Sequence, residues 1–171
     1  RFQPELVFYQ AGADPLADCP DGSVEDICAS HILEHYPMRE VPAVLAEWVR
    51  ALRPGGRLRV SVPDVHWLAD HTEDPRNLYY LVGGQTEEHD FHRSAFTHDT
   101  LSSMLIVAGL SGLEPWQSVN GAVAGLPVSL NIQGRKAGES RSAVKVRIGA
   151  CMSVPRIGWH DNWDCIAETF F

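Results

Sequence analysis

The sequence predicts an α/β fold with a mainly parallel sheet that ends in an antiparallel strand pair. Apolar runs typical of strands alternate with helical segments, in the order strand, helix, strand, helix and then two strands. The last two strands follow one another across a Gly-rich turn, which predicts that they pair antiparallel. With 171 residues, 44% of them hydrophobic and 21% charged, the chain can bury the core of one globular domain.

Two short apolar runs near the start of the chain predict strands. The first, residues 6–9, ends at a turn-prone stretch, and the second, residues 27–29, follows the turn at Asp21-Gly22. The second strand should be buried on both faces, as strands of parallel sheets are.

An amphipathic helix is predicted after Pro37. Apolar side chains recur there at a spacing of three or four residues, with charged residues between them: Val41, Leu45, Trp48, Val49 and Leu52. Pro42 is tolerated only in the first turn of a helix, which places the helix start near Arg39. Pro54-Gly55-Gly56 is expected to end the helix, and both glycines are expected to have positive φ.

The elements after this helix are predicted from alternation and capping. Residues 57–62 alternate apolar and polar side chains as a strand does, and residues 67–84 form a polar stretch with short helical pieces. Thr97 is the predicted N-cap of a helix that ends at Gly109. Residues 113–119 and 128–132 are the predicted closing strand pair.

A change of composition after Gln133 predicts the domain organisation. Residues 134–142 are polar and glycine-bearing, as linkers are, and residues 144–148 begin a new strand-like segment. We therefore expect one domain over residues 1–136, and over residues 137–171 a linker and a tail that contains the start of a second domain.

Charge and cysteine content favour some classes of protein over others. The net charge of −8, without a basic block, disfavours nucleic-acid binding. The sequence has no apolar run as long as a membrane span and no signal-peptide pattern, so no membrane contact is expected. Four scattered cysteines without a CxxC pair predict neither a disulfide scaffold nor a zinc knuckle and fit a reducing cytoplasm.

Three stretches together resemble a known family. They are residues 21–35 (DGSVEDICASHILEH), residues 52–58 (LRPGGRL) and Gly109-Leu110. In this order and spacing they resemble the methyltransferase type 11 group of class I S-adenosylmethionine-dependent methyltransferases, over residues 5–136. Glu25 stands where the family usually has aspartate. The resemblance implies a Rossmann-like three-layer sandwich and S-adenosyl-L-methionine as the cofactor.

The family's glycine-rich GxGxG loop and its ribose-binding acidic residue do not occur in this sequence, because both would precede Arg1. We therefore expect an N-terminally truncated domain that binds the cofactor weakly or not at all. The strand at residues 6–9 is expected to pair beside residues 27–29 or with a partner chain. An unpaired central strand edge would favour a homodimer.

The resemblance also assigns candidate cofactor residues. Ligands of doubly wound sheets bind beyond the carboxyl ends of the strands. Ala29, Ser30 and His31 lie at such an end and are expected to face the cofactor. Asp14, which follows the first strand, stands near the family's acidic residue that hydrogen-bonds the adenine amino group.

Catalysis and acceptor binding are expected around the same strand ends. His31 and His35 are the candidate general bases if the acceptor is a hydroxyl, although alignment alone serves many methyl transfers. Asp64, His66 and His92 are the candidate acceptor-binding residues. The acceptor is expected to be a small molecule or a saccharide, since residues 152–159 are similar to the opening of glycosyltransferase domains.

Two alternatives from other classes stay open. The missing GxGxG loop is compatible with an inactive methyltransferase-like binding or assembly module. The run His31-Ile32-Leu33-Glu34-His35 spells HxxEH, in which two histidines bind zinc and the glutamate acts as base in a hydrolase. Because Tyr36-Pro37 follows at once and limits any helix to about one turn, no metal site is predicted. The other histidines, His89, His92 and His98, are expected in a solvated loop.

Overall fold

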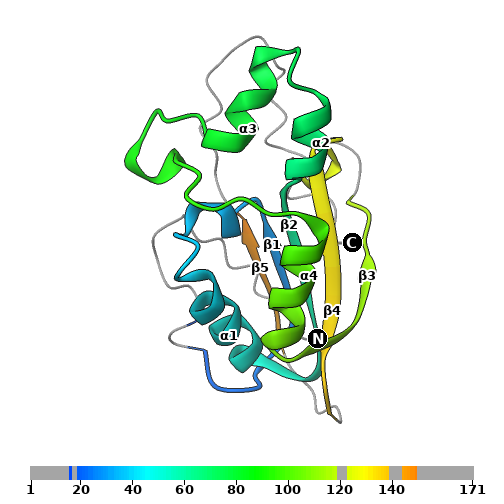
Figure 1. Ribbon diagram of the computed structural model, residues 1–171. Helices are drawn as coiled ribbons and strands as arrows, with labels where there is room; N and C mark the ends of the chain where they lie inside the picture. Colours follow the sequence, from blue (N-terminus) through cyan, green and yellow to red (C-terminus); the bar gives the residue numbers. More distant parts are fainter. Residues whose placement is uncertain (1–15, 17–18, 119–122, 139–143, 150–171) are drawn as a thin grey trace.

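A computed structural model of the chain describes residues 16, 19–118, 123–138 and 144–149 (Figure 1). Its five strands are β1 (Val24–Ser30), β2 (Leu52–Pro63), β3 (Leu110–Pro115), β4 (Ser129–Lys136) and β5 (Val144–Gly149). Its α-helices are α1 (Val41–Ala51), α2 (Val65–Asp70), α3 (Tyr79–Val82) and α4 (His98–Val107). Four 3₁₀ turns complete the described elements: η1 (Leu33–His35), η2 (Pro75–Leu78), η3 (Glu88–Asp90) and η4 (Val123–Gly125).

The strands form one sheet in the order β3-β4-β2-β1-β5. β1 pairs parallel with both β2 and β5, whereas β4 pairs antiparallel with β2 and β3. β4 is therefore the one described strand that opposes the others. This arrangement confirms the predicted α/β fold, with a mainly parallel sheet and a closing antiparallel pair.

Helices α1 and α4 lie side by side on one face of the sheet (Figure 1). The core between them and the sheet contains fully buried Trp48 and Leu45 of α1, Leu101 and Leu105 of α4, and the alternating Leu58, Val60 and Val62 of β2. The described helices thus supply one outer layer of the predicted sandwich. No helix among the described residues is long and apolar enough to cross a membrane.

Local sequence signals placed both of these helices correctly. α1 begins at Val41, with Pro42 in its first turn. Thr97 caps α4 through a capping box, in which its hydroxyl accepts from the Thr100 backbone N–H and the Thr100 side chain accepts from that of Thr97. These contacts satisfy donors that a helix N-terminus leaves without intrahelical partners.

The LRPGG segment differs in detail from the expectation. α1 ends at Ala51, earlier than Pro54, because a residue that precedes proline disfavours the helical conformation. The sheet register then jumps, with Val24 opposite Leu52 but Asp26 opposite Arg57. Gly55 has the predicted positive φ of 75°, whereas Gly56 is not among the residues with positive φ.

The closing elements are shifted relative to the predicted ones. β3 starts at Leu110, earlier than residue 113, and β4 continues to Lys136 through the start of the expected linker. β4 is long because it pairs with β2 along its whole length, from Ser129 opposite Pro63 to Arg135 opposite Arg57. This pairing is between segments far apart in the sequence, so composition near residue 134 does not reveal it.

β5 occupies the sheet edge where the strand at residues 6–9 was expected. It pairs with β1 along Val24 to Ser30, so both edges of β1 are covered by described strands. The expectation of an open edge at β1 is therefore wrong. Residues 6–9 themselves lie outside the described residues, and so does most of the predicted tail.

Candidate functional site

The carboxyl end of β1 turns sharply at His31. This residue has a φ of 51°, which is uncommon for a side chain other than glycine, and its backbone N–H donates to the carbonyl oxygen of Ser61 on β2. The turn directs the chain into η1, which is one 3₁₀ turn and not a longer helix. The HxxEH run therefore does not lie on an α-helix, as a hydrolase of that type requires.

The His31 ring is enclosed and both of its nitrogens have neighbours. Only 1% of the residue is exposed. Its Nε2 lies 2.9 Å from Oγ of Ser129 at the start of β4, and its Nδ1 lies 3.2 Å from Oε1 of Glu34. The His31 ring thus fixes the turn and orients the Glu34 carboxylate.

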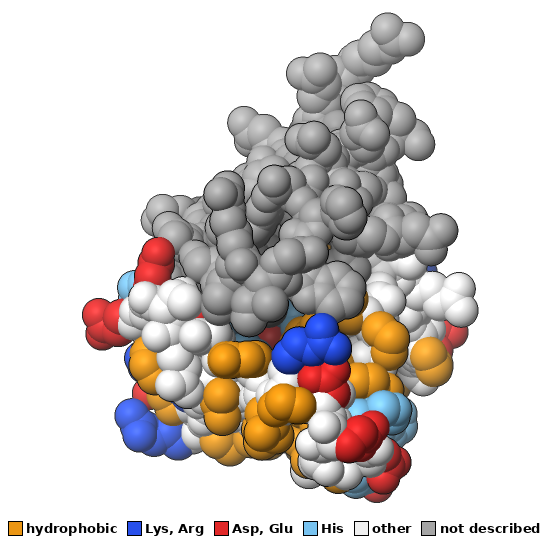
Figure 2. Space-filling model, turned by 90° about the horizontal axis from the view of Figure 1, so that it is seen from above, with side chains coloured by type: hydrophobic (Ala, Val, Ile, Leu, Met, Phe, Trp, Pro, Cys, Tyr) orange, Lys and Arg blue, Asp and Glu red, His pale blue; other side chains and the backbone are white. Residues whose placement is uncertain are grey.

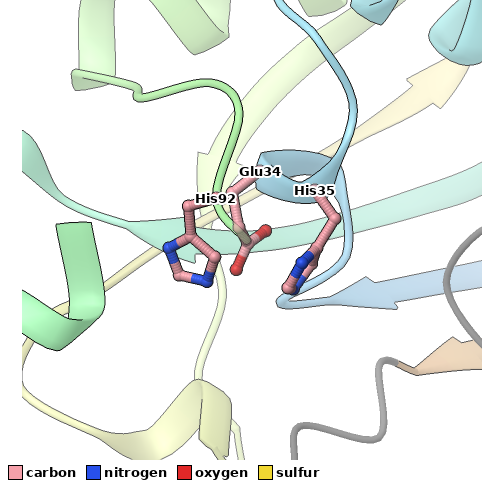
Figure 3. Close-up of side chains that lie close together, drawn as sticks. All are labelled: Glu34, His35 and His92. Carbon is pink, nitrogen blue, oxygen red and sulfur yellow. The ribbon is translucent and has the colours of Figure 1, made fainter. Parts of the chain in front are cut away.

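A cluster of three further polar side chains stands beside this turn. Glu34 and His35 come from η1, and His92 comes from the segment that follows η3 (Figure 3). One potential ligand atom from each of the three lies within 4.8 Å of the others. The His35 and His92 rings meet edge to face, with centroids 4.8 Å apart, and the carboxylate lies between them in the view of Figure 3.

Backbone hydrogen bonds hold the two segments of this cluster together. The N–H groups of Arg93 and Ser94 both donate to the carbonyl oxygen of Glu34, over 2.7 and 3.1 Å. The His92 N–H donates to the carbonyl oxygen of Val82 at the end of α3. The position of His92 is therefore fixed by main-chain contacts on both sides.

The electrostatic environment favours an ionised Glu34 carboxylate next to a neutral His92 imidazole. Burial alone would raise the pKa of Glu34, but the contact with His31 and the nearby His92 and His35 rings lower that pKa overall. Burial lowers the pKa of His92. Nδ1 of His92 lies 2.9 Å from the carbonyl oxygen of Tyr80, which can only accept, so Nδ1 carries the proton and Nε2 keeps its lone pair.

The structure places the predicted cofactor residues as follows. Ala29 is fully buried, Ser30 is half-buried at the end of β1, and His31 is enclosed as described above. Asp14 lies outside the described residues. Ser30 pairs in register with Gly149, so β1 and β5 end side by side.

The predicted acceptor residues do not all come together. His92 joins Glu34 and His35, and so meets one of the two predicted general bases. Asp64 caps α2 by accepting from the backbone N–H of His66, whose side chain is exposed. No contact of Asp64 or His66 with the cluster is seen among the described residues.

Sequence reasoning gave Glu34 a role only in the hydrolase alternative and did not single out Ser129 or Tyr80. Glu34 carried a signal, since it lies within the same short run as both histidines. Ser129 and Tyr80 carried none, because they reach the site only through the antiparallel return of β4 and the packing of α3.

An apolar surface adjoins the cluster at this end of the sheet. A shallow depression, too small to enclose a water molecule, lies between the end of β2 and α3 and is lined by Pro63, Val65, Leu68, Tyr80, Leu81, Ser94 and Ala95. Leu78, Tyr79, Leu81 and Val82 of η2 and α3 are exposed nearby. Figure 2 looks onto this end, where hydrophobic side chains gather beside the part drawn in grey.

Comparison with known proteins supports the family resemblance. Residues 1–60 match the model of the family described as "Methyltransferase domain", a stretch that includes β1, η1 and α1. None of the curated proteins matches the chain significantly.

Several solved structures share the fold. The CurJ carbon methyltransferase is 15% identical with a TM-score of 0.51, over 74% of this chain and 33% of that one. A complex between the Haloferax volcanii Trm112 methyltransferase activator and a chain named as a methyltransferase gives 14% identity and a TM-score of 0.50, over 77% and 61%. The Burkholderia thailandensis 1,6-didemethyltoxoflavin-N1-methyltransferase, with bound S-adenosylhomocysteine, gives 20% and 0.49, over 72% and 49%.

The chain spans less than two thirds of the length of the solved structures it matches. The match over residues 1–60 and the shared Rossmann-like fold confirm the resemblance to class I S-adenosylmethionine-dependent methyltransferases. S-adenosyl-L-methionine is the cofactor that the family resemblance implies.

The strand ends are where the family resemblance predicts the cofactor, and of the predicted residues there only Ser30 is partly exposed. Ser30 and its register partner Ser61 lie at the carboxyl ends of β1 and β2, and the buried Oγ of Ser61 has no hydrogen-bond partner in the described part of the chain. The His31 ring is already engaged by Ser129 and Glu34. The fit therefore lies with the strand ends and Ser30, and not with the imidazole.

Proposed function

We propose that the protein transfers a methyl group from S-adenosylmethionine to a small-molecule or saccharide acceptor. The observation that carries this proposal is the methyltransferase family match over residues 1–60, because it covers the strand end where doubly wound sheets bind ligands. The order of strands adds support. β2 and β5 flank β1 on opposite sides, and a crevice beyond the carboxyl end of β1 is where such folds bind nucleosides.

Catalysis is assigned chiefly to alignment of the acceptor with the sulfonium methyl group. Such alignment by itself can remove a large part of the barrier to transfer. The His31 ring is enclosed, with Nε2 at 2.9 Å from the Ser129 hydroxyl and Nδ1 at 3.2 Å from Oε1 of Glu34, which supports a positioning role better than the role of general base. The exposed Leu78, Tyr79, Leu81 and Val82 support an acceptor with an apolar face on this side. Asp64 and His66, at the start of α2, are proposed to contact its polar groups.

Cofactor binding is tested first. Calorimetry with S-adenosylmethionine and S-adenosylhomocysteine should give weak but saturable heat for the full chain, in line with the weak binding expected from its sequence. Ser30→Tyr should abolish that heat by filling the space at the end of β1, while Ser103→Tyr, the same change at an exposed position on α4, should preserve it. Equal loss in both variants, or undisturbed binding by Ser30→Tyr, would contradict the proposed site.

Transfer is tested separately, with radiolabelled methyl donor and panels of small hydroxylated, aminated and saccharide acceptors. Label in the acceptor supports the enzyme. Absence of both heat and label would favour the alternative, an inactive binding or assembly module. A cytoplasmic location is part of the proposal and rests on the scattered cysteines.

Homodimerisation also remains a proposal. The outer edge of β5 pairs with no described strand, and an edge of this kind can accept a second chain. Light scattering after size exclusion distinguishes a dimer from a monomer.

A further inference from the structure

Several polar atoms of the cluster at η1 make no hydrogen bond within the described part of the chain. Glu34 is 1% exposed, and neither of its carboxylate oxygens has a hydrogen-bond partner among the described residues, although Oε1 lies 3.2 Å from Nδ1 of His31. The same holds for both ring nitrogens of His35 and for Nε2 of His92, all of which are shielded from solvent. Buried polar atoms are normally paired, so a group of them aimed at one point calls for a specific explanation.

We infer that Glu34, His35 and His92 form a binding site for one divalent transition-metal ion, of which Zn²⁺ is the best match. Two imidazoles and one carboxylate are ligands that zinc uses, whereas Mg²⁺ and Ca²⁺ prefer sites made of oxygen atoms. One ion would give each of the three side chains a ligand bond, while the second ring nitrogen of His35 stays without a partner among the described residues.

The separations are compatible with such an ion. Metal bonds of about 2.0–2.2 Å place two ligands of a tetrahedral site roughly 3.4 Å apart. The candidate ligand atoms already lie within 4.8 Å of one another, so a modest closure of the side chains is sufficient. Three protein ligands leave a fourth position open, as in catalytic zinc sites.

The surroundings are those of a metal site. Ligating histidines generally donate their second ring N–H to a carbonyl or carboxylate. His92 does so, since its Nδ1–H donates to the Tyr80 carbonyl and leaves Nε2 for the metal. Glu34 is oriented by His31, whose Nδ1 lies 3.2 Å from Oε1.

This site differs from the HxxEH hydrolase arrangement. There the two histidines of the run bind the metal, but here the His31 ring is bound to Ser129 and Glu34, and a histidine distant in sequence takes its place. The inference also goes beyond methyl transfer, because it concerns a binding event that needs neither S-adenosylmethionine nor an acceptor.

The test uses the full chain, stripped of metal with a chelator and then titrated with Zn²⁺ in a calorimeter. We expect one ion per chain. Glu34→Gln, His35→Gln and His92→Gln should each weaken binding by at least about 100-fold, more than the 10–100-fold typical of losing an outer-shell partner. The matched control is His89→Gln, an exposed histidine of the same segment, which should bind as the parent does.

A second measurement does not depend on the variants folding. Co²⁺ added to the unmodified chain should give the visible absorption of a low-coordinate nitrogen and oxygen site, and Zn²⁺ should displace it. A chain that binds less than one ion, or that gives no such band, overturns the inference. Equal weakening by His89→Gln also overturns it. Methyl transfer can succeed or fail independently of either result.

Discussion

At Asp26 a carboxylate of β1 meets two arginines of β2. The residue is 5% exposed, and its oxygens lie 2.5 Å from Nη2 of Arg57 and 3.1 Å from Nη2 of Arg59. Arg59 also stacks over the ring of Trp116, at 5.8 Å from its centroid. The three charged groups therefore form a connected network on the face of the sheet opposite the α1 and α4 core.

Replacing Asp26 should be costly, because it leaves two guanidinium groups without their shared partner. Asp26→Asn is expected to lower the free energy of unfolding by about 1–2 kcal/mol, less than for a fully buried ion pair because the Arg57 side chain is 34% exposed. Urea unfolding measures it. The control is Asp99→Asn, whose side chain is 94% exposed and which should change stability by less than about 0.5 kcal/mol. Similar values for the two variants would contradict the network.

Two adjacent glycines of the LRPGG segment are needed for different reasons. Gly55 is required by its φ of 75° and not by crowding, since a Cβ at this position would lie 3.6 Å from its nearest neighbour atom. Gly56 is required by crowding, because a Cβ there would lie 2.8 Å from the carbonyl oxygen of Arg53 and 3.0 Å from that of Glu25.

Because the causes differ, the two glycines should tolerate different substitutions. At Gly55, asparagine should cost less than valine, since asparagine tolerates the left-handed region and β-branched residues do not. At Gly56 even alanine should destabilise the protein by about 1–3 kcal/mol through backbone displacement. Thermal unfolding of Gly55→Asn, Gly55→Val and Gly56→Ala checks the order. A Gly56→Ala variant as stable as the parent would show that the turn can open.

At the scale of single elements, η2 is stabilised by a charged cap. Asp74 accepts hydrogen bonds from the backbone N–H and the guanidinium of Arg76. These bonds lower the pKa of Asp74 from 3.8 to about 2. The depressed value means that the cap contributes to stability above about pH 4 and that this contribution is lost as the pH falls toward 2.

The pKa of Asp74 is directly measurable. Carboxyl-carbon NMR should show Asp74 ionised well below the pH at which exposed aspartates titrate. Arg76→Gln removes the guanidinium but keeps the backbone donor, so the pKa of Asp74 should rise part of the way toward its ordinary value. An unchanged pKa in this variant would assign the shift to the backbone bond alone.

Elements governed by local signals were predictable. Spacing of apolar residues and the Thr97 cap located α1 and α4, because both depend on neighbours along the chain. The extent of β4 was not predictable, since it is set by pairing with β2. The cluster at η1 was predictable only in part. Glu34 and His35 share one short run, but His92 is brought there by the next two residues, whose N–H groups donate to the Glu34 carbonyl.

For the molecule as a whole, the unexpected feature is the position of β5. The sequence predicted a strand near Val144 but assigned it to a tail, because nothing local indicates which edge a strand will join. In the structure it pairs parallel with β1 from Val24 to Ser30 and covers the edge of β1 that faces away from β2. The segment after the predicted linker thus helps to build the wall beside the proposed cofactor site, while the domain boundary near residue 136 stays a prediction.

Proline substitutions test whether this pairing holds the sheet together in solution. Successive residues of a strand direct their N–H groups to opposite sides, so of Val146→Pro and Arg147→Pro one must remove a donor to β1. That variant should unfold at lower urea concentration and associate through the exposed β1 edge. The other proline variant should be less destabilised, because the N–H that it loses faces away from β1. Val146→Thr, which keeps a β-branched side chain, is the control. Urea unfolding measures the stability and light scattering measures the association. If both proline variants behave like this control, the stability of the sheet does not depend on the pairing of β5 with β1.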